Sequence, residues 1–326
     1  MAQNAKEAAT AEKGSRVYLV TGGAGFIGSH IVRALARRGE RVRVFDIALA
    51  NGADRLGDVL ADVELIAGDI RDEAALKQAM RGVEVVFHQA AVASVPRSIA
   101  EPELTHAMNL TGTLNVLVAA QHAGARRVVL ASSSAVYGLL PGSPKSESMP
   151  VQPLSPYAAH KVASEQYCQV WHRLHGLESV ALRYFNVFGP MQDPLSEYAA
   201  VIPKFITTVL SGHEPTIFGD GEQSRDFIYI ADVVEANLRA AEQPAAAGQI
   251  FNVGTGASVT LNQLIAELSR IVGRDITPVY TTDRPGDIRE SVADISRLTT
   301  VLGYQPATPF SAGLARTVAA FAANEA

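Results

Sequence analysis

Short apolar runs and longer helix-like segments follow one another from residue 16 to residue 184, with few residues between them. The apolar runs have the length and the flanking turns of buried strands. They predict strands at 16–21, 41–46, 63–67, 85–88, 127–132 and 179–184. The longer segments predict helices at 25–38, 73–80, 102–123 and 156–175. A glycine, the residue that commonly ends a helix, follows each of these helical segments.

This alternation of strands and helices is typical of a parallel sheet with helices on both faces. The predicted fold class is therefore α/β, with a doubly wound parallel sheet of the Rossmann type in residues 15–188. After Gly189, prolines and irregular stretches become more frequent, which indicates a smaller α/β domain in residues 189–326. Residues 227–252 are expected to return to the first domain, so that the two domains are interleaved. Residues 1–14, rich in Ala, Lys and Glu, are expected to form a disordered tail.

A glycine-rich turn joins the first predicted strand to the first predicted helix. Residues 21–28 read Thr-Gly-Gly-Ala-Gly-Phe-Ile-Gly, with Gly22, Gly25 and Gly28 at intervals of three. Glycines at such a turn let backbone N–H groups approach a pyrophosphate at the helix N-terminus, where a side chain would keep it away. The spacing differs from the common G-x-G-x-x-G fingerprint, and by itself the run also fits a glycine-rich turn of an ordinary α/β protein.

Asp46 ends the second predicted strand, where an acidic side chain meets the adenosine ribose in dinucleotide-binding folds. A carboxylate binds the two ribose hydroxyls and repels a 2′-phosphate, so the sequence favours NAD over NADP as the cofactor. Arg41 and Arg43 are nearby, but they alternate with valines, as the solvated face of a strand does.

Residues 155–161 read Ser-Pro-Tyr-Ala-Ala-His-Lys and predict the start of a helix. Serine is a favoured N-cap and proline a favoured first helical residue, which leaves Tyr157 in the first turn. Lys161, one turn further, lies on the same face, and its ammonium is expected to lower the tyrosine pKa from its usual value of about 10. Such a tyrosine is a base poised near neutral pH. Taken alone, a surface tyrosine followed by a solvated lysine is the ordinary interpretation of this spacing.

Three serines, Ser132, Ser133 and Ser134, follow the apolar strand that ends at Ala131. Ligands of open α/β sheets bind at the carboxyl ends of the strands, so at least one of these hydroxyls is expected to face the cofactor. A hydroxyl there can bond the substrate oxygen whose proton Tyr157 takes. A polar strand end without a function is the alternative.

Composition and charge limit the possible functions. The 326 residues are 48% hydrophobic, enough to bury a large core, but no apolar run reaches the roughly 18 residues that a membrane-spanning helix requires. The net charge of -5 gives no electrostatic reason to bind nucleic acid or an anionic membrane. Cys168 is the single cysteine, which excludes an internal disulfide and suits the cytoplasm. His172 and His175 lack an evident third ligand, so we expect no metal site.

A set of motifs spans the chain from Val17 to Pro306. They read TGGAGFIGSH from residue 21, GDI at 68–70, HQAA at 88–91, SSSAVYG at 132–138, SPYAAHK at 155–161, RYFNVFGPMQDP at 183–194, SRDFIYIADV at 224–233 and RPGDIRESVADIS at 284–296. In this combination the chain resembles the extended short-chain dehydrogenase/reductases of the nucleotide-sugar epimerase group. HQAA departs from the more usual HLAA at Gln89, a position that need not disturb a main-chain contact.

The resemblance implies a catalytic set of Ser133, Tyr157 and Lys161. It also implies that NAD is bound by the glycine turn, the acidic strand end and several loops. These cofactor-binding residues are Gly22, Gly25, Phe26, Ile27, Gly28, Asp46, Asp69, Ile70, Ala90, Ala91, Asn109, Tyr157, Lys161 and Phe185. The implied partner is a small-molecule substrate, a UDP-sugar, held mainly by the second domain. The substrate-binding residues are Ser94, Ser133, Asn186, Ala200, Val201, Phe218, Arg225, Arg284, Asp287 and Ser291.

The residues after Ser133 select among the reactions of the group. Dehydratases that resemble this chain carry an Asp-Glu pair where it has Ser134 and Ala135, and decarboxylating relatives keep a Glu in place of Ala135. Both reactions need those carboxylates and are disfavoured here. The resemblance therefore implies redox-neutral 4-epimerisation, in which Tyr157 takes the proton from the sugar O4 and the C4 hydride passes to NAD. The 4-keto sugar turns before the hydride returns to the opposite face.

Ser291 corresponds to the place where family members limit the size of the group at C2 of the sugar. Serine leaves room for an acetamido group, so the expected substrates are UDP-GlcNAc and UDP-GalNAc, with UDP-Glc and UDP-Gal as slower ones. UDP-glucuronate is the alternative within the class. A non-catalytic NAD-sensing or scaffold protein is the alternative of another class, which the retention of the catalytic set disfavours. The helices predicted at 102–123 and 156–175 pair in relatives, which implies a homodimer.

Overall fold

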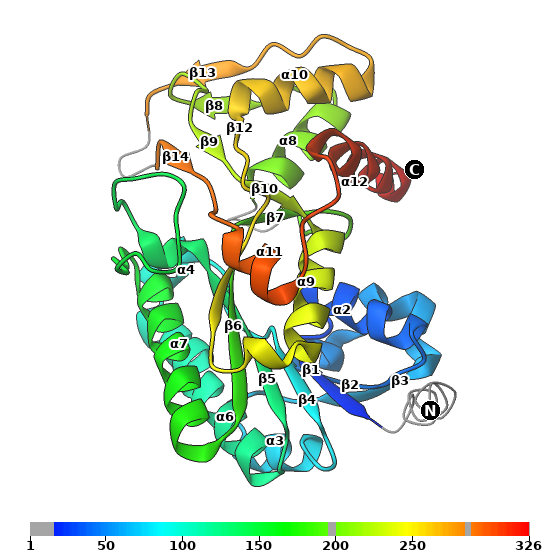
Figure 1. The fold of residues 1–326 in the computed structure, drawn as a ribbon. Helices are drawn as coiled ribbons and strands as arrows, with labels where there is room; N and C mark the ends of the chain where they lie inside the picture. Colours follow the sequence, from blue (N-terminus) through cyan, green and yellow to red (C-terminus); the bar gives the residue numbers. More distant parts are fainter. Residues whose placement is uncertain (1–15, 195–199, 284–287, 326) are drawn as a thin grey trace, which may run out of the picture. The chain divides into compact units, whose positions relative to one another are not determined.

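The computed structural model of the protein describes residues 16–194, 200–283 and 288–325. These residues form two compact units, each assembled from separate segments of the chain (Figure 1). The first unit contains residues 16–132, 155–182 and 237–250, and the second contains the described parts of 133–154, 183–236 and 251–325.

The domain ranges expected from the sequence and these units differ in two places. Residues 133–154, which the sequence assigns to the first domain, belong to the second unit, where the backbone N–H of Lys145 donates to the carbonyl oxygen of Val292. Residues 227–252, expected in the first domain, are divided, and only 237–250 lie in the first unit. The chain therefore passes between the units more often than its sequence pattern indicates.

A seven-stranded sheet has the order β11-β6-β5-β4-β1-β2-β3. Its strands are β1 (Val17–Thr21), β2 (Arg41–Asp46), β3 (Val63–Ala67), β4 (Val85–His88), β5 (Arg127–Ser133), β6 (Glu178–Tyr184) and β11 (Ile250–Val253). β1 pairs in parallel with both β2 and β4, so the strand order reverses beside β1. Ligands of doubly wound sheets bind at such a switch point, outside the carboxyl ends of the strands. This topology confirms the predicted α/β fold class.

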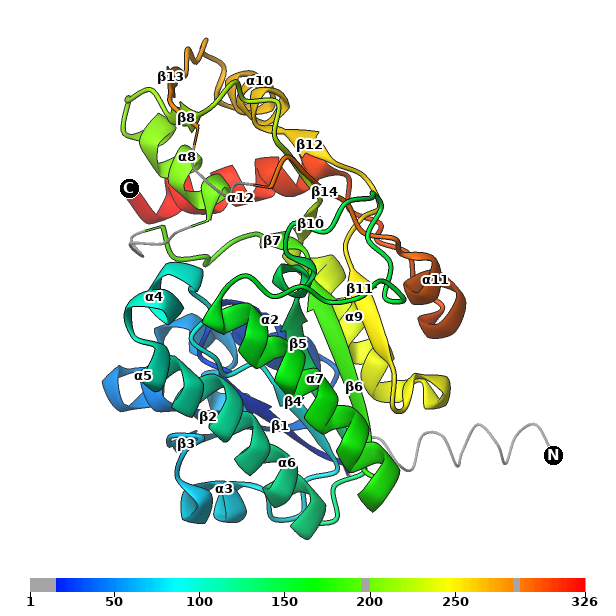
Figure 2. The ribbon, with the colours of Figure 1, turned by 90° about the vertical axis from the view of Figure 1, so that its left-hand side faces the viewer.

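Helices of the first unit lie on both faces of this sheet (Figure 1 and Figure 2). They are α2 (Phe26–Arg37), α3 (Glu73–Ala79), α4 (Val95–Ala100), α5 (Pro102–His106), α6 (Gly112–His122) and α7 (Pro156–His175). The helix predicted over 102–123 is confirmed as continuous helix over 102–122, but a π-helical turn at Ala107–Thr111, which the sequence does not predict, lies between α5 and α6. In that turn the Asn109 side chain is hydrogen-bonded to the backbone of Val92. No helix of the described residues is long and apolar enough to cross a membrane.

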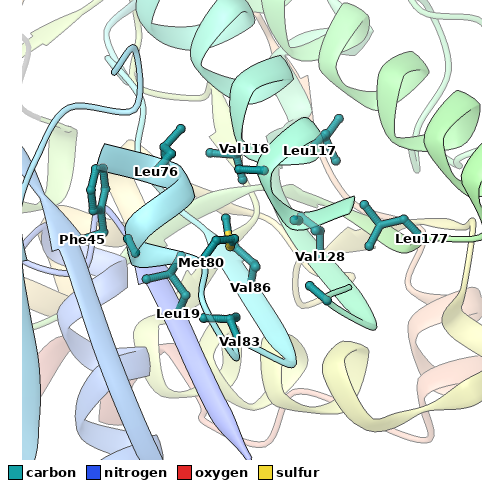
Figure 3. Close-up of a cluster of buried hydrophobic side chains, with 14 of the residues drawn as sticks. Leu19, Phe45, Leu76, Met80, Val83, Val86, Val116, Leu117, Val128 and Leu177 are labelled. Carbon is teal, nitrogen blue, oxygen red and sulfur yellow. The ribbon is translucent and has the colours of Figure 1, made fainter. Parts of the chain in front are cut away.

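The core of the first unit lies between the sheet and α3, α6 and α7 (Figure 3). Its buried side chains come from neighbouring strands and from the facing sides of the helices, and include Leu19, Phe45, Leu76, Met80, Val86, Val116, Leu117 and Val128. Full burial of one such side chain is worth about 1.5–3 kcal/mol. This packing fixes the strands, and with them the loops that follow their carboxyl ends.

The second unit is built from short strands in three small sheets, β10-β7, β12-β9-β14 and β13-β8. The strands are β7 (Asn186–Phe188), β8 (Thr216–Phe218), β9 (Ser224–Arg225), β10 (Phe227–Tyr229), β12 (Val259–Thr260), β13 (Val279–Thr281) and β14 (Glu290–Ser291). The helices are α8 (Val201–Leu210), α10 (Leu261–Val272), α11 (Ser296–Leu302) and α12 (Phe310–Glu325), and α9 (Ile230–Glu242) begins here and ends in the first unit. The Phe188 ring packs against Tyr229 and Phe310, with ring centres 5.7 and 5.6 Å away.

Candidate functional site

The glycine turn joins β1 to α2 at the switch point of the sheet. Gly22 has a φ of 69°, and a Cβ atom built on it would lie 2.5 Å from the backbone nitrogen of Ala90. A Cβ atom on Gly28 would lie 2.1 Å from the carbonyl oxygen of Gly22. The helix that begins at Phe26 has no side-chain cap, which leaves its first N–H groups to an anionic ligand. The turn therefore packs closely on itself and on Ala90, and its free N–H groups suit the pyrophosphate of a dinucleotide.

Asp46 is held against the glycine turn. Its Oδ2 atom accepts a hydrogen bond from the backbone of Ala24 at 2.9 Å, and its Oδ1 atom accepts one from Ala48 at 2.9 Å. Each carboxylate oxygen can accept a second hydrogen bond, as two ribose hydroxyls would require. Arg43 donates instead to Glu64 and to main-chain carbonyls, so its guanidinium is engaged away from this carboxylate.

Asp69 and Ile70 follow β3, in the loop that is expected to meet the adenine. Arg71 donates to both carboxylate oxygens of Asp69 and thereby lowers the pKa of that carboxyl. Ile70 is buried, and its carbonyl oxygen accepts a hydrogen bond from the Asn115 side chain at 3.2 Å. Gly112 lies against Ile70, where a Cβ atom would come within 2.5 Å of that side chain. The sequence motifs do not include Asn115 or Gly112, because both lie on the helix that supports the loop.

A buried polar chain ties β1, β4 and α6 together. Thr21 Oγ1 lies 2.7 Å from His88 Nδ1, and His88 Nε2 lies 2.9 Å from Thr113 Oγ1. Thr113 donates its own proton to the carbonyl oxygen of Asn109 at 2.6 Å, so it accepts from Nε2–H of the histidine. Burial lowers the pKa of His88 to about 3, which keeps the ring neutral. Asn109, expected among the cofactor-binding residues, uses its side chain to hold the backbone of Val92.

Tyr157 lies in the first turn of α7. Ser155 caps this helix by accepting a hydrogen bond from the backbone of Ala158, and Pro156 is its first residue, as the sequence predicts. The backbone N–H of Tyr157 donates to the hydroxyl of Ser98 at 3.1 Å. Ser98 is fully buried on α4, so this hydrogen bond ties the first turn of α7 to α4.

Lys161 is a buried cation one turn after Tyr157. Its Nζ atom lies 5.7 Å from the centre of the Tyr157 ring and donates to the carbonyl oxygen of Ala131 at 2.7 Å. Burial lowers the pKa of Lys161 to about 8. At neutral pH the Lys161 side chain is therefore mostly protonated. Its positive charge lies beside the tyrosine ring.

Ser132 and Ser133 end β5 and have different partners. Ser132 is buried, and its hydroxyl donates to the Glu165 carboxylate of α7 at 2.5 Å. Ser133 Oγ accepts a hydrogen bond from the backbone of Ala135 at 3.2 Å, which starts a 3-10 turn at 134–137. Ser132 is thus used in packing, and Ser133 is the serine that we expect to meet the substrate.

In the second unit, Asp226 organises the strands that carry Asn186, Arg225 and Ser291. Its buried carboxylate accepts from Thr255 at 2.7 Å. Its backbone oxygen accepts from the backbone of Asn186 at 3.0 Å, and its backbone N–H donates to Ser291 at 2.8 Å. Arg225 lies directly opposite Ser291 in the pairing of β9 with β14. Arg225 and Ser291 therefore lie on paired strands, and Asn186, on a strand of another sheet, is linked to them through the backbone of Asp226.

The remaining expected residues are more dispersed. Phe218 ends β8, Val201 begins α8 after its N-cap Ala200, and Phe185 is buried in the second unit. Ser94, in the first unit, caps α4 by accepting a hydrogen bond from the backbone of Arg97. Arg284 and Asp287 lie outside the described residues.

Within residues 16–194, 200–283 and 288–325, no cluster of three or more His, Cys, Asp or Glu side chains could hold a metal ion. On α7, the Nδ1 atom of His172 lies 3.3 Å from the carbonyl oxygen of Leu177, and the His175 ring packs 5.4 Å from that of Trp171. The two histidines are thus engaged with protein groups.

Comparison with known proteins identifies close relatives. Residues 18–254 match the NAD dependent epimerase/dehydratase family. Over 307 residues the chain is 41% identical to a UDP-glucose 4-epimerase of Mycolicibacterium smegmatis, covering 93% of this chain and 97% of that protein. A solved UDP-N-acetylglucosamine 4-epimerase from Methanobrevibacter ruminantium, in complex with UDP-N-acetylmuramic acid, is 43% identical with a TM-score of 0.91, covering 96% of this chain and 99% of that one. A UDP-glucose 4-epimerase from Thermotoga maritima, solved with UDP-glucose, is 37% identical with a TM-score of 0.90, covering 95% and 100% of the two chains.

Proposed function

The chain belongs to the NAD dependent epimerase/dehydratase family, and from this we propose that it is a UDP-sugar 4-epimerase that prefers UDP-GlcNAc and UDP-GalNAc. UDP-Glc and UDP-Gal are slower substrates in this proposal. The observation that carries the reaction class is the pair of Tyr157 and Lys161, with the ammonium 5.7 Å from the centre of the ring. A protein that only sensed NAD would need the glycine turn but not a buried lysine beside a tyrosine.

NAD is held by the first unit in this proposal. Gly22 and Gly28 allow the close backbone packing of the turn that holds the pyrophosphate in this proposal, and Asp46 offers acceptors to the ribose hydroxyls. When bound, NAD supplies a reversible hydride acceptor for C4 of the sugar. The negative charge of Asp46 and the engagement of Arg43 with other groups both disfavour a 2′-phosphate, which supports NAD rather than NADP.

Tyr157 is the proton acceptor in the proposed reaction. Its phenolate takes the proton of the O4 hydroxyl while C4 loses a hydride, which leaves a 4-keto sugar, and the proton returns to O4 when the hydride returns to C4. The Lys161 ammonium stabilises the phenolate electrostatically. The Ser133 hydroxyl bonds O4 and keeps it directed at the tyrosine. The enzyme and its cofactor end the cycle unchanged.

The residues after Ser133 support epimerisation over the other reactions of the family. Ser134 and Ala135 stand where dehydration would require an acid and a base, and neither side chain is a carboxyl. A methyl group at Ala135 cannot assist a decarboxylation. The proposed cycle needs no further acid or base than the tyrosine.

The second unit holds the UDP-sugar in this proposal. Arg225 is suited to the diphosphate, and Asn186 and Phe218 to the nucleoside and sugar. Ser291, opposite Arg225, is the small side chain that leaves space for an acetamido group at C2. The similarity to a UDP-N-acetylglucosamine 4-epimerase supports this preference.

The test is a set of separate reactions of the purified protein with UDP-GlcNAc, UDP-GalNAc, UDP-Glc, UDP-Gal and UDP-glucuronate. Inversion at C4 is followed by proton NMR of the sugar ring. We expect the two acetamido sugars to have the highest kcat/KM. Turnover of UDP-glucuronate alone would replace the acetamido assignment by the uronate alternative, and absence of inversion in all five reactions would overturn the proposed function.

We further propose that the protein forms a homodimer through α5, α6 and α7, the helices predicted at 102–123 and 156–175. Val170 and Leu174 are apolar side chains on α7 with exposed fractions of 41% and 72%. Burial of these groups against a second copy would remove apolar surface from water. Light scattering of the purified protein should give the dimer mass, and Leu174→Glu should reduce it toward the monomer mass. A wild-type monomer at micromolar concentration would contradict this proposal.

A further inference from the structure

One face of α7 is buried against β5 and carries charge. Lys161, Glu165 and Cys168 lie on this face, and their exposed fractions are 6%, 1% and 2%. Two consecutive residues of β5 form hydrogen bonds with this face of α7. The carbonyl oxygen of Ala131 accepts from Lys161 Nζ at 2.7 Å, and Ser132 Oγ donates to Glu165 at 2.5 Å. The proposed reaction uses Lys161 but gives no role to Glu165.

The Glu165 carboxyl group is held by a short hydrogen bond, which the Ser132 hydroxyl donates to it at 2.5 Å. Water screens the charge of a side chain buried to this degree only weakly. A buried carboxylate is costly unless a cation and hydrogen-bond donors compensate it. Lys161 and Ser132 supply these two kinds of partner.

Burial and Glu165 act on Lys161 in opposite directions. Burial is the larger effect and lowers the pKa of Lys161 to about 8, whereas the negative charge of Glu165 raises it. The other groups that bear on the ammonium are neutral at pH 7. Burial raises the pKa of Cys168 to about 12 and lowers that of His88, on β4, to about 3. Burial also lowers the pKa of His160, which precedes the lysine on α7.

We propose that Glu165, fixed by Ser132, is a positioning residue that keeps Lys161 cationic and so sustains the phenolate of Tyr157. Among the described groups that act on Lys161, Glu165 is the one carboxylate. The effect on Tyr157 rests on the proposed epimerase function, but the effect on the lysine does not. Packing alone would not require a charge here, because apolar side chains of similar volume often replace buried ions without loss of stability.

The first test is an NMR titration that needs no substrate. Lysine labelled with carbon-13 at Cε is titrated in the NAD-loaded wild type and in Glu165→Gln, and the Lys161 signal is assigned with Lys161→Arg. Loss of an adjacent negative charge should bring the lysine pKa down by about one pH unit or more. Ser164→Ala is the matched control, because it removes a buried polar side chain from the same helix without changing charge, and it should leave the titration in place. An unchanged Lys161 titration in Glu165→Gln would overturn the proposal.

The second test is the pH dependence of kcat with UDP-GlcNAc. In Glu165→Gln the decline of kcat at high pH should move to lower pH by the same amount as the lysine titration, with KM within about twofold of wild type because Glu165 does not touch the substrate. A fall in kcat with an unmoved pH profile would show a structural role only and contradict the proposal. If the wild type inverts no UDP-sugar, the proposed function fails while the titration still decides the role of Glu165.

Ser132→Ala covers the case in which Glu165→Gln does not fold. Without its hydroxyl the carboxylate is less well fixed near the lysine, so the Lys161 titration should shift in the same direction by a smaller amount. Far-UV circular dichroism establishes that each variant is folded. No shift of Lys161 in folded Ser132→Ala would overturn the fixing role of Ser132.

Discussion

The two units differ in how each holds the residues proposed to bind a ligand. In the first unit the cofactor residues follow strands of four to seven residues in one sheet, and the fit depends on backbone shape at Gly22 and Gly28. In the second unit the substrate residues lie on strands of two or three residues, organised by the single carboxylate of Asp226. The comparison indicates that changes in the first unit abolish function, whereas changes in the second alter which sugar is accepted.

Among the predictions, replacing the proposed base in the first unit should cause the largest loss of activity. Tyr157→Phe removes the phenol but keeps the ring, so kcat should fall by about 10²–10⁴, while NAD binding remains. Tyr167→Phe is the control, because it makes the same change on the same helix and should leave kcat unaltered. Steady-state rates with UDP-GlcNAc measure both. A kcat of Tyr157→Phe within threefold of wild type would refute the assigned base.

The backbone fit of the cofactor is tested by Gly28→Ala. Its Cβ atom would come within 2.1 Å of the Gly22 carbonyl oxygen, so the turn must shift and the Kd for NAD should rise by about a hundredfold, or about 2.8 kcal/mol. A Cβ atom on Gly57 would meet nothing within 4 Å, so Gly57→Ala is the matched control. Calorimetric titration with NAD gives both constants. Equal affinities would mean that the turn does not hold the pyrophosphate.

A substitution at Ser291 in the second unit should change the substrate preference. Ser291→Tyr places a ring where the acetamido group is proposed to lie, so kcat/KM for UDP-GlcNAc should fall by about tenfold to a hundredfold, and that for UDP-Glc by much less. Ser291→Ala keeps the space and should retain the wild-type ratio. Paired assays with the two substrates measure the ratio. Equal losses for both sugars in Ser291→Tyr would place the acetamido group elsewhere.

The smallest effect concerns the stability of the first unit in acid. Burial lowers the pKa of His88 from 6.5 to about 3, so between these values the unfolded chain binds more protons than the folded one. The free energy of unfolding should therefore fall with decreasing pH below 6.5, with a contribution from His88 that approaches about 1.4 kcal/mol per pH unit. Urea unfolding at pH 7, 6 and 5 measures this slope. His88→Asn should lack the contribution, and an identical slope in both proteins would contradict it.

The sequence predicts those features that repeat over many residues. The alternation of strands and helices predicts the doubly wound sheet, and β2, β3 and β4 have the predicted bounds. Ser155 and Pro156 predict the start of α7, because capping depends on local residues. The motifs predict the family and NAD, and both are confirmed.

The sequence does not predict features that depend on contacts between distant segments. The π-helical turn around Asn109 is absent from the helical pattern, because the partner of that side chain, Val92, lies on another loop. Ser98 has no motif, although it fixes the backbone of Tyr157. Glu165 reads as an ordinary helical acid, and only the hydrogen bond to Ser132 reveals that it is buried beside the lysine.

The most direct test of the account is the fate of the hydrogen on C4. UDP-GlcNAc that carries deuterium at C4 is incubated with the protein in ordinary water, and the UDP-GalNAc formed is analysed by NMR and mass spectrometry. If Tyr157 moves only the O4 proton and the hydride returns from bound NAD, the product keeps its deuterium at C4. Loss of that deuterium to solvent during inversion would contradict the central claim.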